Sequence, residues 1–187
     1  TASINTPVSD DTVINLTSAG AAKYSTDFTS DAATRISTIA GDNNEGDANN
    51  QLRYPQGVFV DKEGIVYVAD ENNGRIQKFL PGNTEGLTII SDLGLPRDVF
   101  VDADGLIYVL EHSDHKVSKW AADGSSLGIV AGGQGGGNNA DQLNYPQALF
   151  VDIAGAIYIA DGENNRIQKW EFEATEGTTV ADINNFE

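Results

Sequence analysis

Three segments of this chain, each beginning at a proline, share one sequence pattern, and this repeat constrains the fold more than any other feature. The prolines are Pro55, Pro96 and Pro146. Counting from each of them without a gap, an aspartate follows after six residues, a tyrosine after twelve and an acid after fifteen. A cation follows after twenty residues and an aromatic residue after twenty-four. The chain is therefore built from copies of one structural unit, and its fold must accommodate that unit three times.

Each repeat predicts four short antiparallel strands. In the first repeat, short runs that contain β-branched and aromatic residues lie at 58–60, 65–68 and 76–79. Asp-Lys-Glu-Gly between the first two runs predicts a tight turn with glycine at a positive φ. A fourth run follows in every repeat, at 87–90, 127–130 and 178–180. The prolines lie 41 and 50 residues apart, a period typical of propeller blades. We expect an all-β chain, a β-propeller with three four-stranded antiparallel blades at about residues 54–91, 95–131 and 145–182.

The repeats resemble the NHL repeat β-propeller family. The resemblance rests on the Tyr-Pro-x-Gly/Ala-x-Phe-Val-Asp opening, the Tyr-Val/Ile-Ala-Asp strand end, the Asn-Asn-Arg-Ile-Gln segment and the Ile/Val-Ala-Gly ending with its long Gly/Asn loop. It covers about residues 36–182, and it implies a propeller segment over 36–187. The second repeat departs most, with Glu-His-Ser-Asp-His-Lys at 111–116. Residues 1–35 lack the repeat and are an N-terminal extension or linker, a degenerate blade, or a strand donated to a neighbour.

Three blades cannot close a ring, since closed propellers use four to eight. The sequence adds one spare outer strand at Ile36–Ala40. An open array leaves unpaired strand edges and an apolar blade face at each end, and both promote association. We therefore expect missing sequence, further copies of the chain or a different protein partner to complete the array through these open blade edges.

Composition excludes several classes of partner. The formal net charge is -17, from 11 Lys and Arg against 28 Asp and Glu, so the chain is repelled by nucleic acid and by anionic membranes. No apolar run approaches the roughly 18 residues of a spanning segment, so no membrane insertion is expected. No cysteine is present, which excludes disulfides and thiolate sites. This acidity and the absence of an initiator methionine lead us to expect an extracellular or cell-surface protein, either a mature secreted chain or a fragment of a longer one.

The loops before each first strand and between strands two and three should emerge on one face, where binding usually occurs on such a scaffold. The acids at the ends of the second strands lie there, and they have two interpretations. They form a ring of carboxylates for Ca²⁺, or each accepts backbone N–H bonds within its own turn, which the repetition favours. These acids are Asp70, Glu111 and Asp161.

Two further sets of polar residues are candidate binding residues on this face. His112 and His115 could supply part of a zinc site, or they are polar turn residues. Peptide-amidating lyases, which are NHL-like propellers with a catalytic zinc, place histidines at such turns, but the matching turns here offer Gly74 and Arg166. The second set follows the prolines and comprises Gln56, Arg97, Asp98 and Gln147. Arg97 is expected to pair with a carboxylate or to meet an anionic group of a ligand.

No nucleophile with its base and no phosphate-binding loop is recognisable, so enzyme activity is unsupported. We expect a secreted or surface-displayed, non-catalytic module for protein interaction and assembly, without a cofactor or with Ca²⁺ as the alternative. The alternative function is a metal-dependent hydrolase or lyase that uses the loop-rich face. Carbohydrate binding ranks lower, because Tyr54 and Tyr145 precede prolines, where we expect them to have a structural role.

Overall fold

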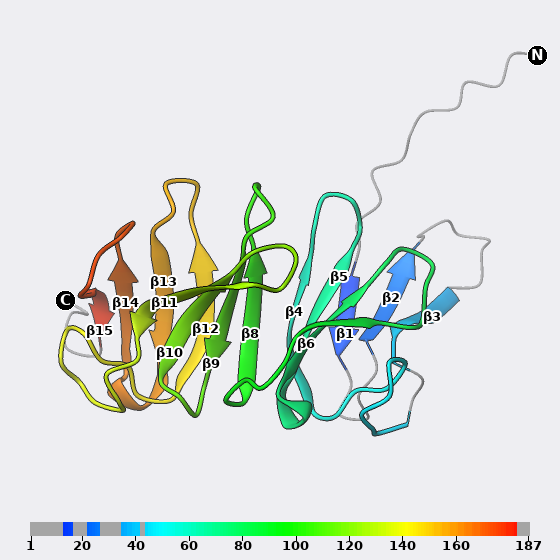
Figure 1. Cartoon of the computed structure of the whole chain (residues 1–187), viewed down its shortest axis with the longest axis horizontal. Coiled ribbons are helices and arrows are strands. Elements are labelled where there is room, and N and C mark those ends of the chain that lie inside the picture. The colour runs from blue at the N-terminus through cyan, green and yellow to red at the C-terminus, as the bar shows by residue number, and fades with distance from the viewer. Residues whose placement is uncertain (1–12, 17–21, 27–34, 42–43, 183–187) are drawn as a thin grey trace, which may run out of the picture.

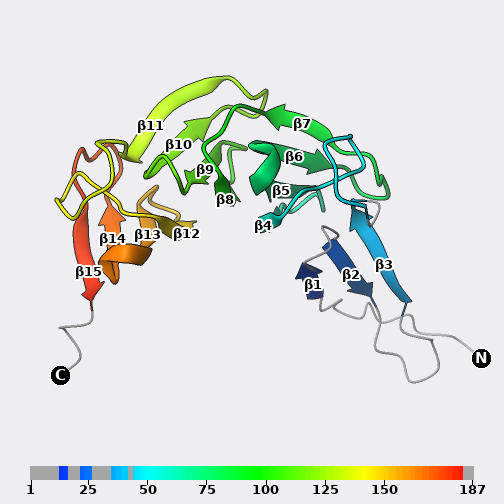
Figure 2. The same cartoon turned by 90° about the horizontal axis from the view of Figure 1, so that it is seen from below.

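A computed structural model of the chain describes residues 13–16, 22–26, 35–41 and 44–182. Within these ranges the regular structure is β-strand, apart from two single-turn 3-10 helices, η1 (Glu71–Asn73) and η2 (Gly162–Asn164). The strands form four antiparallel sheets that follow one another along an open arc (Figures 1 and 2). The predicted all-β class is confirmed. No helix in the described ranges has the length and apolar character needed to cross a membrane.

The three repeats form three four-stranded sheets, here called blades one, two and three. Each blade is a meander whose strands pair in chain order, as predicted. Figure 2 shows the first strand of every blade on the inner side of the arc and the fourth strand on the outer side. The strands are β4 (Pro55–Val60), β5 (Val66–Asp70), β6 (Arg75–Phe79) and β7 (Leu87–Ile90) in blade one; β8 (Pro96–Val101), β9 (Ile107–Glu111), β10 (Lys116–Trp120) and β11 (Ser126–Gly132) in blade two; and β12 (Pro146–Val151), β13 (Ile157–Asp161), β14 (Arg166–Trp170) and β15 (Thr178–Asp182) in blade three.

A fourth, three-stranded sheet precedes blade one. It contains β1 (Val13–Leu16), β2 (Ala22–Thr26) and β3 (Arg35–Ala40), in that order. The spare outer strand expected at Ile36–Ala40 is thus part of β3 and pairs with β2. The division of the chain at residue 35 stays a prediction, and residues 1–12, 17–21 and 27–34 lie outside the described residues.

The tight turns between the first two strands of each blade have the predicted geometry. Gly64, Gly105 and Gly155 have φ of 77°, 81° and 83°. In blade one the Asp61 carboxylate accepts the backbone N–H of Ile65 at 2.8 Å, which closes the turn. These turns lie at the opposite end of each blade from the proline, because Pro55 pairs with Asp70 at the start of the sheet.

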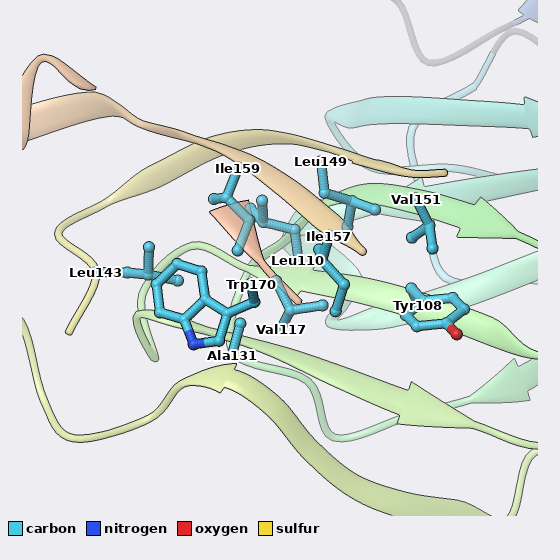
Figure 3. Close-up of a cluster of buried hydrophobic side chains, with 10 residues drawn as sticks. All are labelled: Tyr108, Leu110, Val117, Ala131, Leu143, Leu149, Val151, Ile157, Ile159 and Trp170. Carbon is cyan, nitrogen blue, oxygen red and sulfur yellow. The ribbon is translucent and has the colours of Figure 1, made fainter. Parts of the chain in front are cut away.

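Apolar side chains fill the interfaces between neighbouring sheets. The side of a blade that faces the next blade along the chain is here called its forward side. On the forward side of blades one and two, the residues at positions twelve, fourteen, twenty-one and thirty-five after the proline are buried. In blade one they are Tyr67, Ala69, Ile76 and Ile90, and in blade two Tyr108, Leu110, Val117 and Ala131. Figure 3 shows the interface between blades two and three, where the blade-two residues meet a set from blade three that includes Leu149, Ile159 and Trp170. Burial of large apolar side chains contributes about 1.5–3 kcal/mol each, so these interfaces hold the array together.

One buried leucine enters each interface from the loop that precedes a blade. It stands three residues before the proline in all three repeats, as Leu52, Leu93 and Leu143. Leu52 packs with Ala40 of β3, and Leu143 belongs to the cluster that contains Ala131 of blade two (Figure 3). We call these three side chains the entry leucines.

Candidate functional site

The loops before the first strands and the turns after the second strands gather at one end of the array, as predicted. The register places Pro55 opposite Asp70, and the other blades repeat this pairing, so each proline lies beside the acid that ends its second strand. We call this end of the blades the mouth.

A buried carboxylate organises the mouth of blade one. Asp70 is fully buried and accepts three hydrogen bonds, from Arg53 N at 2.6 Å, Asn73 Nδ2 at 2.8 Å and Arg75 Nε at 2.7 Å. Arg75 also donates to the carbonyl oxygens of Asp47, Ala48 and Gln51 at 2.7–3.0 Å. The ion pair therefore ties the long loop before blade one to the end of β5.

Blade three repeats this arrangement. Asp161 accepts from Asn144 N at 2.6 Å and from Asn164 Nδ2 and Arg166 Nε, both at 2.8 Å. Arg166 donates in turn to three carbonyl oxygens of the preceding loop, those of Asn138, Asn139 and Gln142. We call the two arrangements the carboxylate clamps.

Blade two has a different network at the same positions. Glu111 Oε1 accepts from Ser118 Oγ at 2.6 Å, and Glu111 Oε2 accepts from Gly94 N at 3.1 Å and lies 3.2 Å from Lys116 Nζ. Lys116 also donates to Asp114 at 2.9 Å, and this bond helps to hold the pKa of Asp114 below its usual value. The departure of the second repeat from the family pattern thus replaces the arginine clamp with a lysine pair.

These contacts bear on the metal ligands expected at Asp70, Glu111 and Asp161. Each carboxylate is already bonded to backbone N–H groups and to a cation of its own blade. A metal ion would have to displace those partners. Across the described ranges, no group of three or more His, Asp or Glu side chains is placed where it could hold a metal ion. A Ca²⁺ role for these acids stays a prediction.

The two histidines join blade two to the entry of blade three. His112 Nδ1 lies 3.0 Å from the carbonyl oxygen of Pro146, which only accepts, so Nδ1 is the donor. His115 Nδ1 accepts the backbone N–H of Tyr145 at 3.0 Å. Both imidazoles contact the Tyr145 ring, at centroid distances of 5.1 Å and 4.6 Å. The pair therefore positions Tyr145.

The residues that follow the prolines also link the blades. Arg97 donates to Gln147 Oε1 of blade three at 2.6 Å and to Glu71 Oε1 of blade one at 3.2 Å. Arg97 thus pairs with a carboxylate, one of the two roles expected for it. Gln56 occupies the same position in blade one and is partly exposed. The structure therefore brings Arg97 and Gln147 together.

Asp98 joins the inner strands of blades two and three. Its side chain accepts the backbone N–H groups of Val99 and Leu149, both at 2.9 Å. Burial raises the pKa of Asp98 above its ordinary value, an effect that these two hydrogen bonds oppose. On the blade-one side, a Cβ at Gly57 would lie 2.6 Å from the Asp98 Cα, so only glycine fits there without a shift.

Two features of the mouth were not predicted from the sequence. Glu71 is buried and reaches across to Arg97, but neither the spacing nor the motif distinguished it. Tyr54, Leu95 and Tyr145, which precede the prolines, have φ of 53°, 50° and 46°. A residue before proline normally favours an extended backbone, so their left-handed conformation could not be predicted. The two tyrosines, interpreted above as structural, are 56% and 45% exposed.

The comparisons with known proteins agree with this architecture. Residues 52–79 match the family model described as NHL repeat. A 40-residue stretch is 55% identical to the E3 ubiquitin-protein ligase TRIM71 of Gallus gallus, but it covers only 21% of this chain and 5% of that protein.

Solved structures resemble a much larger part of the chain. A chain of a nidogen/laminin complex gives a TM-score of 0.64 at 18% identity, over 88% of this chain and 60% of that one. A gluconolactonase from Xanthomonas campestris gives a TM-score of 0.59 at 15% identity, over 72% of this chain and 49% of that one. At these identities the likeness shows the fold alone. Residues 52–79 of this chain are therefore an NHL repeat, and its repeats are blades of a β-propeller.

Proposed function

We propose that this chain is a non-catalytic protein-interaction and assembly module that uses the mouth of its blades as a docking surface outside the cell or at the cell surface. One observation carries the proposal. Tyr54, Leu95 and Tyr145 hold large side chains in solvent on a left-handed backbone, one in each blade. Such a conformation costs about 1–3 kcal/mol for a residue other than glycine, and it is typical of ligand-binding sites.

The surroundings of these side chains suit recognition of a protein. The carboxylate clamps and the two histidines hold the backbone beneath Tyr54 and Tyr145, so ordering these two tyrosines costs little further entropy on binding. Tyrosine and arginine are among the residue types that dominate binding energy at protein interfaces. Arg97 of blade two lies at this end and contacts both blade one and blade three. The nidogen/laminin complex offers an example of a similar fold in a protein assembly.

The charge of the chain supports a protein as the partner and the proposed location outside the cell or at its surface. A net charge of -17 disfavours polyanions and favours neutral or basic protein surfaces. It also maintains solubility in the salt of an extracellular medium. The 40-residue match covers only 5% of the TRIM71 ligase, so the activity of that larger protein is not proposed for this chain.

Selection from a peptide-display library tests the proposal. The chain should enrich peptides whose binding falls about thirtyfold or more when Tyr54 and Tyr145 are both replaced by serine, the loss of a typical interface hot spot. Tyr54→Phe and Tyr145→Phe should retain most of the binding. Phe172→Ser is the matched control, because this exposed aromatic lies at the other end of its blade, near Gly155. Peptides that bind the serine variant and the native chain equally would place the docking surface elsewhere.

The alternative, a metal-dependent hydrolase or lyase, has its support in the fold shared with the gluconolactonase. Thermal melts with Zn²⁺, Ca²⁺ and a chelator test it. A rise in melting temperature with Zn²⁺ that His115→Ala abolishes would favour this alternative, and so would a rise with Ca²⁺ that Glu111→Gln abolishes. Melting curves that do not change with either ion would count against it.

A further inference from the structure

A cavity of about 530 Å³ lies between blades two and three. Blade two contributes Tyr108 and Ala131 of its forward side together with Lys119, and blade three contributes Ile157 and Trp170. Figure 3 shows Tyr108, Ala131 and Trp170 within the buried cluster between these blades. The volume falls within the range of about 300–1,000 Å³ that is typical of small-molecule sites.

The size of one side chain distinguishes this interface from the one between blades one and two. At position thirty-five after the proline, blade one has Ile90 and blade two has Ala131. Ile90 is 3% exposed and belongs to the cluster against which Trp120 packs. Ala131 and Trp170 belong to the equivalent cluster between blades two and three. Alanine fills less volume than isoleucine, so it leaves room here that Ile90 occupies in the first interface.

Lys119 is a partly buried cation in the wall of this cavity. It pairs with Tyr108 in the sheet, so both side chains lie on the forward side, and its ammonium is 4.9 Å from the centre of the Tyr108 ring. Among the described residues no carboxylate lies within 4.0 Å of this ammonium, whereas Lys116 and Lys169 each have such a partner. A tyrosine ring attracts a cation without accepting its three N–H groups as a carboxylate does. The ammonium can therefore still donate to a ligand.

Two glutamates also line the cavity, and neither compensates Lys119. Glu171 accepts from Lys169 Nζ at 2.6 Å, so its charge is paired within blade three. Glu173 is exposed, and solvent and salt screen its charge. The uncompensated charge in the partly buried region of the cavity is therefore positive.

We infer that this cavity binds a small apolar molecule that carries one carboxylate. The carboxylate accepts charge-assisted hydrogen bonds from Lys119 Nζ, and the apolar part of the molecule covers Ile157 and Trp170. The charges disfavour two other classes of ligand. A dianion such as phosphate is poorly compensated by one lysine in a chain of net charge -17, and a cation would be repelled by Lys119. This binding activity is additional to the assembly function proposed for the mouth.

The fluorescence of Trp170 tests the inference, because this residue lines the cavity. The chain has two tryptophans, and Trp120→Phe leaves Trp170 as the single one. A bromine atom quenches indole fluorescence on contact, so ω-bromooctanoate should quench Trp170 saturably below about 1 mM. ω-Bromooctanol has the same chain without the charge and should bind about tenfold or more weakly.

Three substitutions identify the groups that hold the ligand. Lys119→Met removes the ammonium and should weaken binding of ω-bromooctanoate about tenfold or more, while binding of ω-bromooctanol stays within about twofold. Lys78→Met is the matched control, because Lys78 holds the same repeat position in blade one, 5.5 Å from the centre of the Tyr67 ring. Ala131→Ile introduces the residue of blade one and should weaken binding of both molecules by filling the cavity.

Circular dichroism verifies that each variant is folded, and calorimetric titration of octanoate into the unchanged chain repeats the binding measurement without a substitution. If Ala131→Ile does not fold, Lys119→Met decides the result. Equal affinity for the carboxylate and the alcohol overturns the inference, as does unchanged binding by Lys119→Met or the absence of both quenching and heat. Stronger competition by a short peptide that ends in leucine would assign the site to a chain terminus and overturn the small-molecule ligand.

These results are independent of the mouth. Tyr54 and Tyr145 do not line the cavity, so replacing both by serine should leave the quenching unchanged. Saturating octanoate should likewise leave peptide selection at the mouth unchanged. Failure of one site is therefore distinguishable from failure of the other.

Discussion

Replacement of Arg75 by alanine should destabilise blade one strongly. The change removes the cation that faces Asp70, whose side chain is 0% exposed, and it frees three carbonyl oxygens of the preceding loop. Removing one partner of a buried ion pair costs about 3–5 kcal/mol, because the remaining charge stays buried without compensation. That loss is a large part of the roughly 5–15 kcal/mol by which a typical domain is stable.

The size of the effect depends on burial, and the same loop offers a control. Arg53 pairs with Glu45 at 2.8 Å, but these side chains are 54% and 67% exposed. Arg53→Ala should therefore change the free energy of unfolding by about 1 kcal/mol or less. Arg75→Lys keeps the charge but loses the planar guanidinium that reaches the loop carbonyls. Its cost in unfolding free energy should therefore lie between those of Arg75→Ala and Arg53→Ala.

Urea denaturation followed by circular dichroism measures these free energies, and it should be repeated in 1 M NaCl. Salt should reduce the small effect of Arg53→Ala and leave that of Arg75→Ala nearly unchanged, since buried pairs are poorly screened. Limited proteolysis should also cut the loop at 44–54 faster in Arg75→Ala. If Arg75→Ala costs no more than Arg53→Ala, the clamp does not organise the loop and the reasoning from burial is refuted.

Three further predictions concern packing and charge. Gly57→Ala should cost about 1–3 kcal/mol in thermal or urea unfolding, because the added Cβ meets the backbone of Asp98; a neutral result would show that the two inner strands separate easily. Trp170→Ala should cost about 3–5 kcal/mol, since this ring is 1% exposed, whereas Phe172→Ala, at 62% exposure, should stay within about 0.5 kcal/mol; similar losses would contradict the burial of the first ring. In an NMR titration of the carboxyl carbons, Asp98 should titrate above the ordinary value of 3.8 and Asp114 below it. The reverse order of these two pKa values would refute the assigned environments. Because its folded pKa is raised, Asp98 contributes most to stability below its unfolded pKa and loses this contribution as the pH rises through its folded pKa.

Much of the fold could be predicted because local patterns specify it. The repeats after Pro55, Pro96 and Pro146 predicted four strands each, since runs of β-branched and aromatic residues and tight-turn glycines are properties of short segments. The same spacing placed the loops and the acids at one end of the blades, because a meander fixes which turns share an end. The spacing did not decide whether these acids bind Ca²⁺ or accept hydrogen bonds within their own turns.

The contacts between blades could not be predicted from the sequence, because they join residues far apart along the chain. Arg97 meets Glu71 and Gln147, which are 26 and 50 residues away, and only the packing of three sheets brings them together. The left-handed backbone at Tyr54 and Tyr145 likewise opposes the local preference of a residue before proline, and the surrounding tertiary contacts maintain it.

The sequence by itself determined the unit of this protein, a short meander with apolar residues on both faces, because strand, turn and repeat are encoded within some forty residues. Only the tertiary structure decided what each unit does to its neighbour. It showed that a leucine from each entry loop packs against the sheet before it. The physical reason is that burial is a property of two surfaces in contact, and a sequence pattern describes one surface at a time.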